Sequence, residues 1–489
     1  MLEVNNLFHA TRIIEGYGVI ETTGQECANL GFGKVLVITD PFLASSEHYK
    51  KLKKSLDDAK IENFLLTNVK PNPRAEDCDE MAEFAKKNHV DALIALGGGS
   101  AMDQAKAVGA VVTNGKSTVE WGDTELDTNI LPLICIPSTS GTGAEVTWCA
   151  VITDTERQYK MTVGDPVHMI PVLAICDPEI TIGLPKSLTA ACGVDALTHC
   201  IEAYTVQLHQ PITDALALKG ISMIAENLEK AYENGEDREA RRNMMIASTI
   251  GGMAFISSNV GAVHAFAETV GAWFDTPHGV ANSLFLPYIM EFNIPACPER
   301  FADIADAMGI EREESMSDEQ YALKAVEYVK ALNRKLNIPT IKEIKGITEA
   351  VVVRVTDKKA DEAITLEDIE PYKEEICEGK IVLFNTNWYK TRGTDEFFHH
   401  PYVNGDVAKY LVDNGVRFIG IDTINTDQTG GTEFPVHDLF SEKRLMIGEN
   451  WAFFDQIDFE RPYVIALPMK LIGCDGSPVR AIAVQWEEE

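Results

Sequence analysis

The fold is indicated most clearly by one ten-residue stretch, Asp91-Ala-Leu-Ile-Ala-Leu-Gly-Gly-Gly-Ser100. Its first six residues have the pattern of a buried β-strand, and three glycines follow before a helical pattern begins. Glycines let the backbone approach a phosphate closely, and the N-terminus of the next helix offers free N–H groups and positive potential. The stretch matches neither G-x-G-x-x-G nor a P-loop, so a plain tight turn stays open as an alternative.

Strands and helices alternate on both sides of this stretch, up to about residue 185. Further strand patterns lie at 34–39, 64–67, 131–136 and 172–176, and helical patterns lie at 46–59 and 75–89. Such alternation is typical of a parallel sheet with helices on both faces. We therefore expect residues 1–185 to form an α/β, doubly wound, nucleotide-binding domain.

A second polar loop, Pro137-Ser-Thr-Ser-Gly-Thr-Gly143, follows the strand pattern at 131–136. Ligands of open α/β sheets bind at the carboxyl ends of the strands, so the two loops together predict a nucleotide site. Asp40 also ends a strand pattern. A carboxylate there can bind a ribose 2′-hydroxyl and would repel a 2′-phosphate, which favours NAD over NADP. A helix-capping or turn role for Asp40 before Pro41 is the alternative.

Composition restricts the classes of function. The chain has 489 residues, 45% of them hydrophobic, and a formal net charge of −32. This charge argues against nucleic acid and anionic membranes as partners. The ten cysteines occur singly, which indicates free thiols in a reducing compartment. No secretory-signal pattern and no apolar run long enough for a membrane helix is found, so we expect a cytoplasmic protein.

The sequence between residues 186 and 340 is rich in alanine and is predicted to form a helical domain, with helical patterns at 216–227, 239–254 and 321–336. It contains four candidate metal ligands, Asp195, His199, His264 and His278. Asp195 and His199 are four residues apart, so on a helix they share one face. One carboxylate and three imidazoles suit Fe(II) or Zn(II), usually with an open position for substrate. Such an ion polarises oxygen.

The last part of the chain, 341–489, is predicted to be β-rich and to form a third domain. Its strand patterns lie at 349–355, 380–384, 416–421, 444–447, 463–467 and 479–484, separated by turn-forming sequences. The change from helical to strand patterns places a domain boundary at about 340–346.

From about residue 5 to 340 the motifs resemble those of the iron-dependent (group III) alcohol dehydrogenases. The matching segments are 97–106, 137–147, 177–178, 195–204 and 261–279. The resemblance implies an NAD(P)-binding domain, a helical metal domain, an active site between them and at least a dimer. It also implies ligand roles for Asp195, His199, His264 and His278, and cofactor contacts from Asp40, Asn72, Gly97, Gly98, Ser100, Thr139, Thr142 and Lys160.

The implied reaction is hydride transfer between NAD(H) and a small primary alcohol or aldehyde. The bound metal lowers the pKa of the alcohol, and the protein supplies orientation and electrostatics. The candidate catalytic residues are His264, Phe255, which the resemblance places near the substrate, and Glu268. Many members of the family carry a second histidine where this chain has Glu268, so this carboxylate is a candidate for a proton path. The last helices expected for members of this family do not appear in the sequence after Pro339.

Residues from about 346 to 486 resemble a different group, the metal-dependent cyclases that include bacterial kynurenine formamidases. The matching segments are 381–388, 415–423, 434–437, 447–450 and 475–483. These hydrolases use a metal to activate water against an amide or lactone, and the resemblance makes His437 and Glu449 metal ligands. The His-x-Gly-Thr-His-x-Asp motif that supplies the other ligands does not occur in the sequence. Two alternatives to the dehydrogenase therefore stay open: a metal-dependent hydrolase, or an inactive fusion of two incomplete enzymes.

Overall fold

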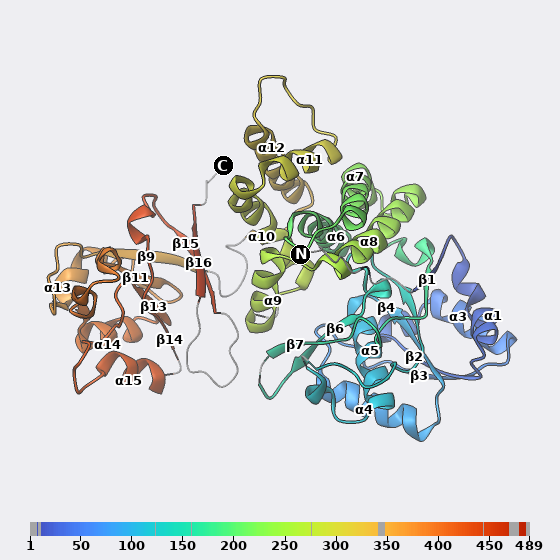
Figure 1. Ribbon diagram of the computed structural model, residues 1–489. Coiled ribbons are helices and arrows are strands. Elements are labelled where there is room, and N and C mark those ends of the chain that lie inside the picture. Colours follow the sequence, from blue (N-terminus) through green and yellow to red (C-terminus); the bar gives the residue numbers. More distant parts are fainter. Residues whose placement is uncertain are drawn as a thin grey trace, which may run out of the picture. The chain divides into compact units, whose positions relative to one another are not determined.

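The protein is described from a computed structural model, in residues 7, 11–122, 124–157, 159–274, 276–340, 348–443, 445–468 and 479–485. The chain divides into two compact units, Met1–Thr340 and Ile341–Glu489. Figure 1 colours the first unit from blue through yellow and the second from orange to red.

A six-stranded sheet forms the centre of the first half of unit 1. Its strand order is β1-β8-β5-β4-β2-β3, and all of its neighbouring strands are parallel. The strands are β1 (Arg12–Glu15), β2 (Lys34–Ile38), β3 (Glu62–Leu66), β4 (Ala92–Gly97), β5 (Leu133–Pro137) and β8 (Leu173–Cys176). The predicted doubly wound sheet is confirmed. The order reverses between β2 and β4, which is where ligands bind to folds of this kind.

Helices cover both faces of this sheet because alternate strand residues point to opposite sides. Val35 and Val37 share a core with α1 (Thr23–Leu30) and α3 (Glu47–Asp58). Leu36 and Ile38 share the other core with α4 (Ala75–Lys87) and α5 (Gly99–Asn114). The short helix α2 (Pro41–Ala44) follows β2 directly.

A two-stranded antiparallel hairpin, β6 (Cys149–Asp154) and β7 (Tyr159–Gly164), follows the second polar loop. The sequence patterns did not predict it. Lys106 of α5 is fully buried and donates hydrogen bonds of 2.8 Å to Thr147 Oγ1 and to the carbonyl oxygen of Cys149. This lysine therefore ties the start of the hairpin to the helix that begins at the glycine turn.

Helices form the second half of unit 1. They are α6 (Lys186–Thr205), α7 (Pro211–Glu233), α8 (Arg238–Ser258), α9 (Ala262–Phe274), α10 (His278–Asn293), α11 (Pro298–Ala307) and α12 (Asp318–Lys335). From Gly193 to Tyr204 every residue of α6 is buried, and the helix packs against α7, α8 and α10. A helix buried on all sides is the core of its domain.

Among the described residues, no single helix has the length and apolar composition needed to cross a membrane. In the part of the chain that the structure describes, one pair of segments has that length and composition when taken together, α8 and residues 262–271 of α9. These two segments meet at a bend of 105°.

Unit 2 has its own six-stranded sheet, in the order β14-β13-β11-β9-β15-β16. Its strands are β9 (Thr348–Arg354), β11 (Ile381–Asn385), β13 (Phe418–Ile421), β14 (Met446–Gly448), β15 (Tyr463–Pro468) and β16 (Val479–Val484). The first four in the order are parallel, and β15 and β16 are antiparallel. The predicted β-rich segment is present. Residues 475–478 of the cyclase-like pattern lie outside the described residues.

Smaller elements complete unit 2. They are α13 (Leu366–Ile369), α14 (Gly405–Asp413), α15 (Pro435–Glu442) and the two-stranded pair β10 (Ala363–Ile364) and β12 (Tyr402–Val403). Val407 and Leu411 of α14 and Phe440 of α15 are buried in one core with the parallel strands.

Candidate metal centre

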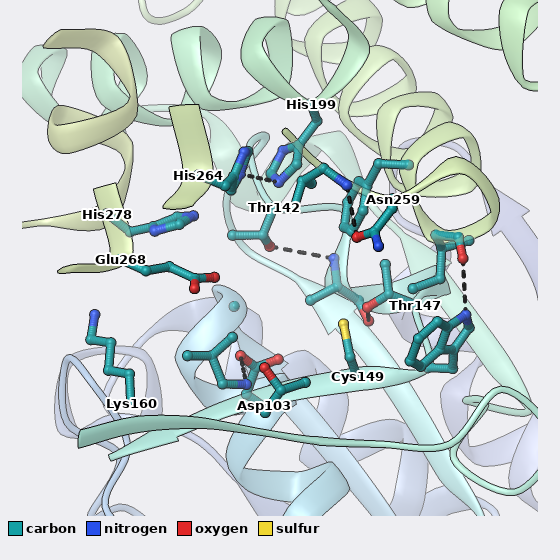
Figure 2. Close-up of a pocket in the computed structure, with 18 of the residues that line it drawn as sticks. Asp103, Thr142, Thr147, Cys149, Lys160, His199, Asn259, His264, Glu268 and His278 are labelled. Carbon is teal, nitrogen blue, oxygen red and sulfur yellow. Dashed lines mark hydrogen bonds between the residues drawn. The ribbon is translucent and has the colours of Figure 1, made fainter. Parts of the chain in front are cut away.

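The four predicted metal ligands come together inside unit 1. Asp195 and His199 lie one turn apart on α6, His264 lies in the first turn of α9, and His278 is the first residue of α10. One nitrogen or oxygen atom from each lies within 4.8 Å of the others. The Nε2 atoms of His199 and His264 are 2.9 Å apart, and Nε2 of His278 is 3.6 Å from Asp195 Oδ1. Figure 2 shows His199, His264 and His278 facing one cavity.

Two further side chains surround the ligands, and neither was predicted from the sequence. Glu202 of α6 accepts a hydrogen bond of 2.5 Å from Nδ1 of His264. Asn282 of α10 places its amide nitrogen 2.6 Å from Asp195 Oδ1, 3.1 Å from His264 Nε2 and 3.2 Å from His278 Nε2. Their spacings are a helical signal, because Glu202 follows His199 by three residues and Asn282 follows His278 by four.

Burial and mutual contact shift the pKa values of the ligands. Burial lowers the pKa of His199 to about 3 and that of His278 to about 4, although 32% of the His278 side chain stays exposed. Burial alone would raise the pKa of Asp195, but the surrounding imidazoles outweigh it, and this pKa is lowered. At neutral pH Asp195 is therefore ionised and His199 and His278 are neutral, which are the forms that bind metal.

His264 differs from the other two histidines. Burial disfavours its charged form, but the Glu202 carboxylate outweighs burial, and the pKa of His264 is raised. A metal ion would take the place of the proton on Nε2. The Nε2 atoms of His199 and His264, 2.9 Å apart, would then both direct lone pairs at the cation. The donor set of one carboxylate and three imidazoles therefore fits Fe(II) or Zn(II).

A cavity of about 440 Å³ connects the ligands with the carboxyl ends of the sheet. His199, His264 and His278 line this cavity, and so do Gly99 and Ser100 of the glycine turn. Figure 2 shows Thr142, Cys149 and Asp103 around the same cavity as the three histidines. One cavity therefore adjoins both the glycine turn and the metal ligands.

The predicted cofactor residues fall into two groups. Asn72, Ser100, Thr142 and Lys160 line the cavity, whereas Asp40, Gly97, Gly98 and Thr139 are not among its lining residues. The two polar loops do lie side by side, since a Cβ atom on Gly98 would lie 3.2 Å from Thr139 Oγ1. Asp40 Oδ1 accepts hydrogen bonds of 2.8 Å and 3.0 Å from the amides of Phe42 and Leu43. Asp40 is therefore the N-cap of α2, the alternative role considered for it, and its contact with a ribose stays a prediction.

The two other candidate catalytic residues also line the cavity. The ring of Phe255 stacks on His199 with a centroid distance of 4.4 Å. Figure 2 shows the Glu268 carboxylate pointing into the cavity near His278 and Lys160. Burial raises the pKa of Glu268, while His264 and Lys160 oppose that shift.

Asp103 and Cys149 also line the cavity and were not predicted as site residues. Asp103 Oδ2 accepts a 3.0 Å hydrogen bond from the amide of Val151, and burial raises the pKa of Asp103 to about 6. Asp103 was visible in the glycine-turn motif. Cys149 belongs to the hairpin that the patterns missed.

Comparisons with known proteins identify the class. Residues 10–178 match the family model described as iron-containing alcohol dehydrogenase, and residues 189–378 match the C-terminal model of the same family. The chain is 39% identical to a choline dehydrogenase of Bacillus subtilis over 71% of this chain and 86% of that protein. It is 35% identical to an NAD-dependent methanol dehydrogenase of Bacillus methanolicus over 71% of this chain and 91% of that one.

A solved structure gives the same result. A 1,3-propanediol oxidoreductase superposes with a TM-score of 0.67 and 35% identity, covering 69% of this chain and 88% of that one. The chain belongs to the iron-containing alcohol dehydrogenase family. It is an NAD-dependent, metal-dependent dehydrogenase of small alcohols, and the family's iron fits the site formed by Asp195 and the three histidines.

The second resemblance is not supported. Both matching family models describe iron-containing alcohol dehydrogenases, and the C-terminal model extends to residue 378, beyond the predicted boundary near 340. His437 Nε2 and Glu449 Oε1 do lie 3.4 Å apart, as expected for the pair, but Nδ1 of His437 is 2.7 Å from Asp427. Hydrogen bonds to Asp427 and Glu449 raise the pKa of His437 to about 10. In this structure His437 is held between two carboxylates, and its role as a metal ligand with Glu449 stays a prediction from the sequence.

Proposed function

We propose that this protein interconverts a short primary alcohol and its aldehyde with NAD(H), using Asp195, His199, His264 and His278 to hold one divalent metal ion. The observation that carries the proposal is the convergence of ligand atoms of these four side chains within 4.8 Å of one another, beside a cavity that the three histidines and the glycine turn line together. Family membership supports it. Fe(II) is the ion we propose, with Zn(II) as the alternative for the same donors.

When bound, the divalent ion supplies Lewis acidity that lowers the pKa of an alcohol. The protein's own residues do the rest. Ser100 and Thr142, which both line the cavity, bind and orient the dinucleotide. Orientation of the two reactants converts hydride transfer into an effectively unimolecular step.

Phe255 is proposed to form the apolar wall of the substrate site. Its ring stacks directly on His199, one of the proposed metal ligands. Trp148 and Ile256 line the same cavity. Apolar walls around a single polar anchor favour a short alcohol with few polar groups.

Glu268 is proposed to move the proton that the alcohol loses. It is largely buried beside Lys160 and His264, and its raised pKa brings it nearer to neutrality than an exposed glutamate. A carboxylate with a raised pKa is a better proton acceptor than an ordinary glutamate, so Glu268 can take up the proton and pass it on.

Asp40 is proposed to favour NAD over NADP. Its carboxylate stands at the end of β2, beside the point where the strand order reverses. Negative charge at that place would repel a 2′-phosphate. We further propose a cytoplasmic protein without nucleic acid or membrane partners, on the basis of the −32 net charge and the single cysteines. The proposal that it is a homo-oligomer rests on its resemblance to the family.

We propose that unit 2 does not contain the active site. Within the described residues, only one group of three or more His, Cys, Asp and Glu side chains converges as metal ligands do, and it is the group of Asp195. The hydrolase alternative would depend on His437 and Glu449 alone, whereas catalytic zinc sites have three protein ligands and water. Residues 341–489 are therefore proposed as an accessory domain of the dehydrogenase chain.

The test uses the purified full chain, freed of metal and reloaded with Fe(II) or Zn(II). NADH absorbance is followed with ethanol, propanol and 1,3-propanediol, and in reverse with the aldehydes. Asp195→Ala should abolish turnover, while Glu299→Gln, an exposed carboxylate on α11, should leave it unchanged. Absence of any alcohol-dependent NADH formation by the loaded wild-type protein would refute the proposed function.

A further inference from the structure

Glu202 holds His264 from the side opposite to the metal ligands. It lies on α6 three residues after His199, and only 5% of its side chain is exposed. Its Oε2 atom is 2.5 Å from Nδ1 of His264. Its Oε1 atom accepts a 2.6 Å hydrogen bond from the amide of Val263. Both carboxylate oxygens therefore hold the first turn of α9.

The position of this carboxylate is fixed by the backbone. Val263 is the second residue of α9, so its N–H is one of the four that a helix leaves without an internal partner. A helix N-terminus also favours negative charge. A Cβ atom on Gly261 would lie 2.8 Å from Glu202 Oε1. A larger residue at this position would therefore collide with the carboxylate, and glycine avoids that collision.

The contact determines which nitrogen of His264 carries hydrogen. An ionised carboxylate only accepts hydrogen bonds, so Nδ1 of His264 must donate to Glu202. The proton released on metal binding is then the one on Nε2, and Nε2 faces His199 at 2.9 Å. A histidine with its hydrogen fixed on the far nitrogen is oriented and more basic as a ligand.

We propose that Glu202 is a positioning residue of the metal centre, which holds the His264 ring in the orientation and tautomer that bind the ion. The proposal rests on the proposed metal-binding role of His264 but not on the identity of the alcohol. Glu202 is not among the residues that line the cavity of about 440 Å³, so its effect on the reaction is indirect, and the proposal assigns that effect to His264. The competing interpretation is that Glu202 merely joins α6 to α9.

Zn(II) binding to the metal-free full chain separates these interpretations. The measurement is competition with a chromophoric chelator, without NAD or alcohol, on wild type, Glu202→Gln, His264→Ala and the double variant. Glu202→Gln keeps the shape of the side chain and removes its charge. It should weaken Zn(II) binding about 10- to 100-fold. The melting temperature of the metal-free chain reports any purely structural effect.

The double variant provides the decisive comparison. If Glu202 acts through His264, Glu202→Gln should cause no further loss of Zn(II) affinity in the His264→Ala background. Glu299→Gln is the control for the substitution itself. Glu299 is an exposed carboxylate of α11, and it lines, together with Glu202, a cavity of about 540 Å³ that shares no lining residue with the one at the metal ligands. Glu202→Asp, which retains the charge, replaces Glu202→Gln if that variant does not fold.

Three results would overturn the proposal. They are unchanged Zn(II) affinity in Glu202→Gln, additive losses in the double variant, or an equal loss in Glu299→Gln. Failure of the proposed function is distinguishable, because a wild-type chain that binds Zn(II) through Asp195 and His264 yet oxidises no alcohol leaves the role of Glu202 intact.

Discussion

Gly143 ends the second polar loop where that loop touches α8, and replacing it with alanine tests the packing of the cofactor side of the cavity. Its φ of +60° lies in the left-handed region. A Cβ atom there would lie 2.6 Å from the Cα of Gly252 and 2.8 Å from the carbonyl oxygen of Ser248. Both are backbone atoms of α8, so neither can move away as a flexible side chain would.

The cost of Gly143→Ala has two parts. Left-handed backbone costs an alanine about 1–2 kcal/mol. The forced displacement of the loop from α8 adds about 1–3 kcal/mol, as in an overpacked core. The sum is about 2–5 kcal/mol, which is a large fraction of the usual stability of a domain.

Gly31 is the matched control. It ends α1 with a φ of 82° and ψ of 17°, close to the 60° and 20° of Gly143, but nothing lies within 4 Å of the Cβ atom it would gain. Gly31→Ala should therefore cost only the conformational part, about 1–2 kcal/mol. The difference in unfolding free energy between the two variants therefore gives the cost of the collision between the new Cβ atom and α8.

Urea unfolding followed by circular dichroism measures the stability of both variants. The KM for NAD shows whether the loop still supports cofactor binding. The midpoint of Gly143→Ala should lie below that of Gly31→Ala, and the KM for NAD should rise in Gly143→Ala alone. Equal midpoints and equal KM values would refute the argument, because they would mean that the loop does not depend on its contact with α8.

Three further predictions concern the cavity. Burial raises the pKa of Asp103 to about 6, so the folded chain binds more protons than the unfolded chain between about pH 4 and 6, and stability falls as the pH rises through that range. Asp103→Asn should remove this decline. Between pH 4 and pH 7 the unfolding free energy of the variant should therefore fall by on the order of 3 kcal/mol less than that of the wild type, measured by urea unfolding at both pH values. Phe255→Ala should raise the KM for short alcohols about tenfold or more while metal binding stays unchanged, because the apolar wall beside His199 is lost; an unaltered KM would remove Phe255 from the substrate site. Glu268→Gln should lower kcat by about 10²–10⁴ and abolish the loss of activity on the acidic side that protonation of this carboxylate causes. A pH profile identical to that of the wild type would exclude Glu268 from the proton path.

Patterns of hydrophobic residues were sufficient to predict most of the sheet in unit 1. The strand at 91–96 and the turn after it became β4 and the start of α5, because a continuous apolar run bounded by glycines permits few other structures. The ligands were predictable for a similar reason, since Asp195 and His199 are adjacent on any helix.

What the sequence did not reveal depends on contacts between distant segments. Glu202 is one of many glutamates, and only the packing of α6 against the start of α9 brings it to His264. The hairpin β6–β7 was missed, and its start is fixed by a contact that the local sequence does not show, the hydrogen bonds from the buried Lys106 of α5. His437 and Glu449 were correctly placed as neighbours, but the engagement of Asp427 with the other ring nitrogen could not be foreseen.

The central claim is that Asp195, His199, His264 and His278 hold one metal ion. Anomalous diffraction at the iron or zinc absorption edge, from crystals of the reloaded full chain, tests it most directly. The account predicts one strong peak about 2.0–2.2 Å from a ligand atom of each of the four side chains. A peak between His437 and Glu449 with none at Asp195 would contradict it.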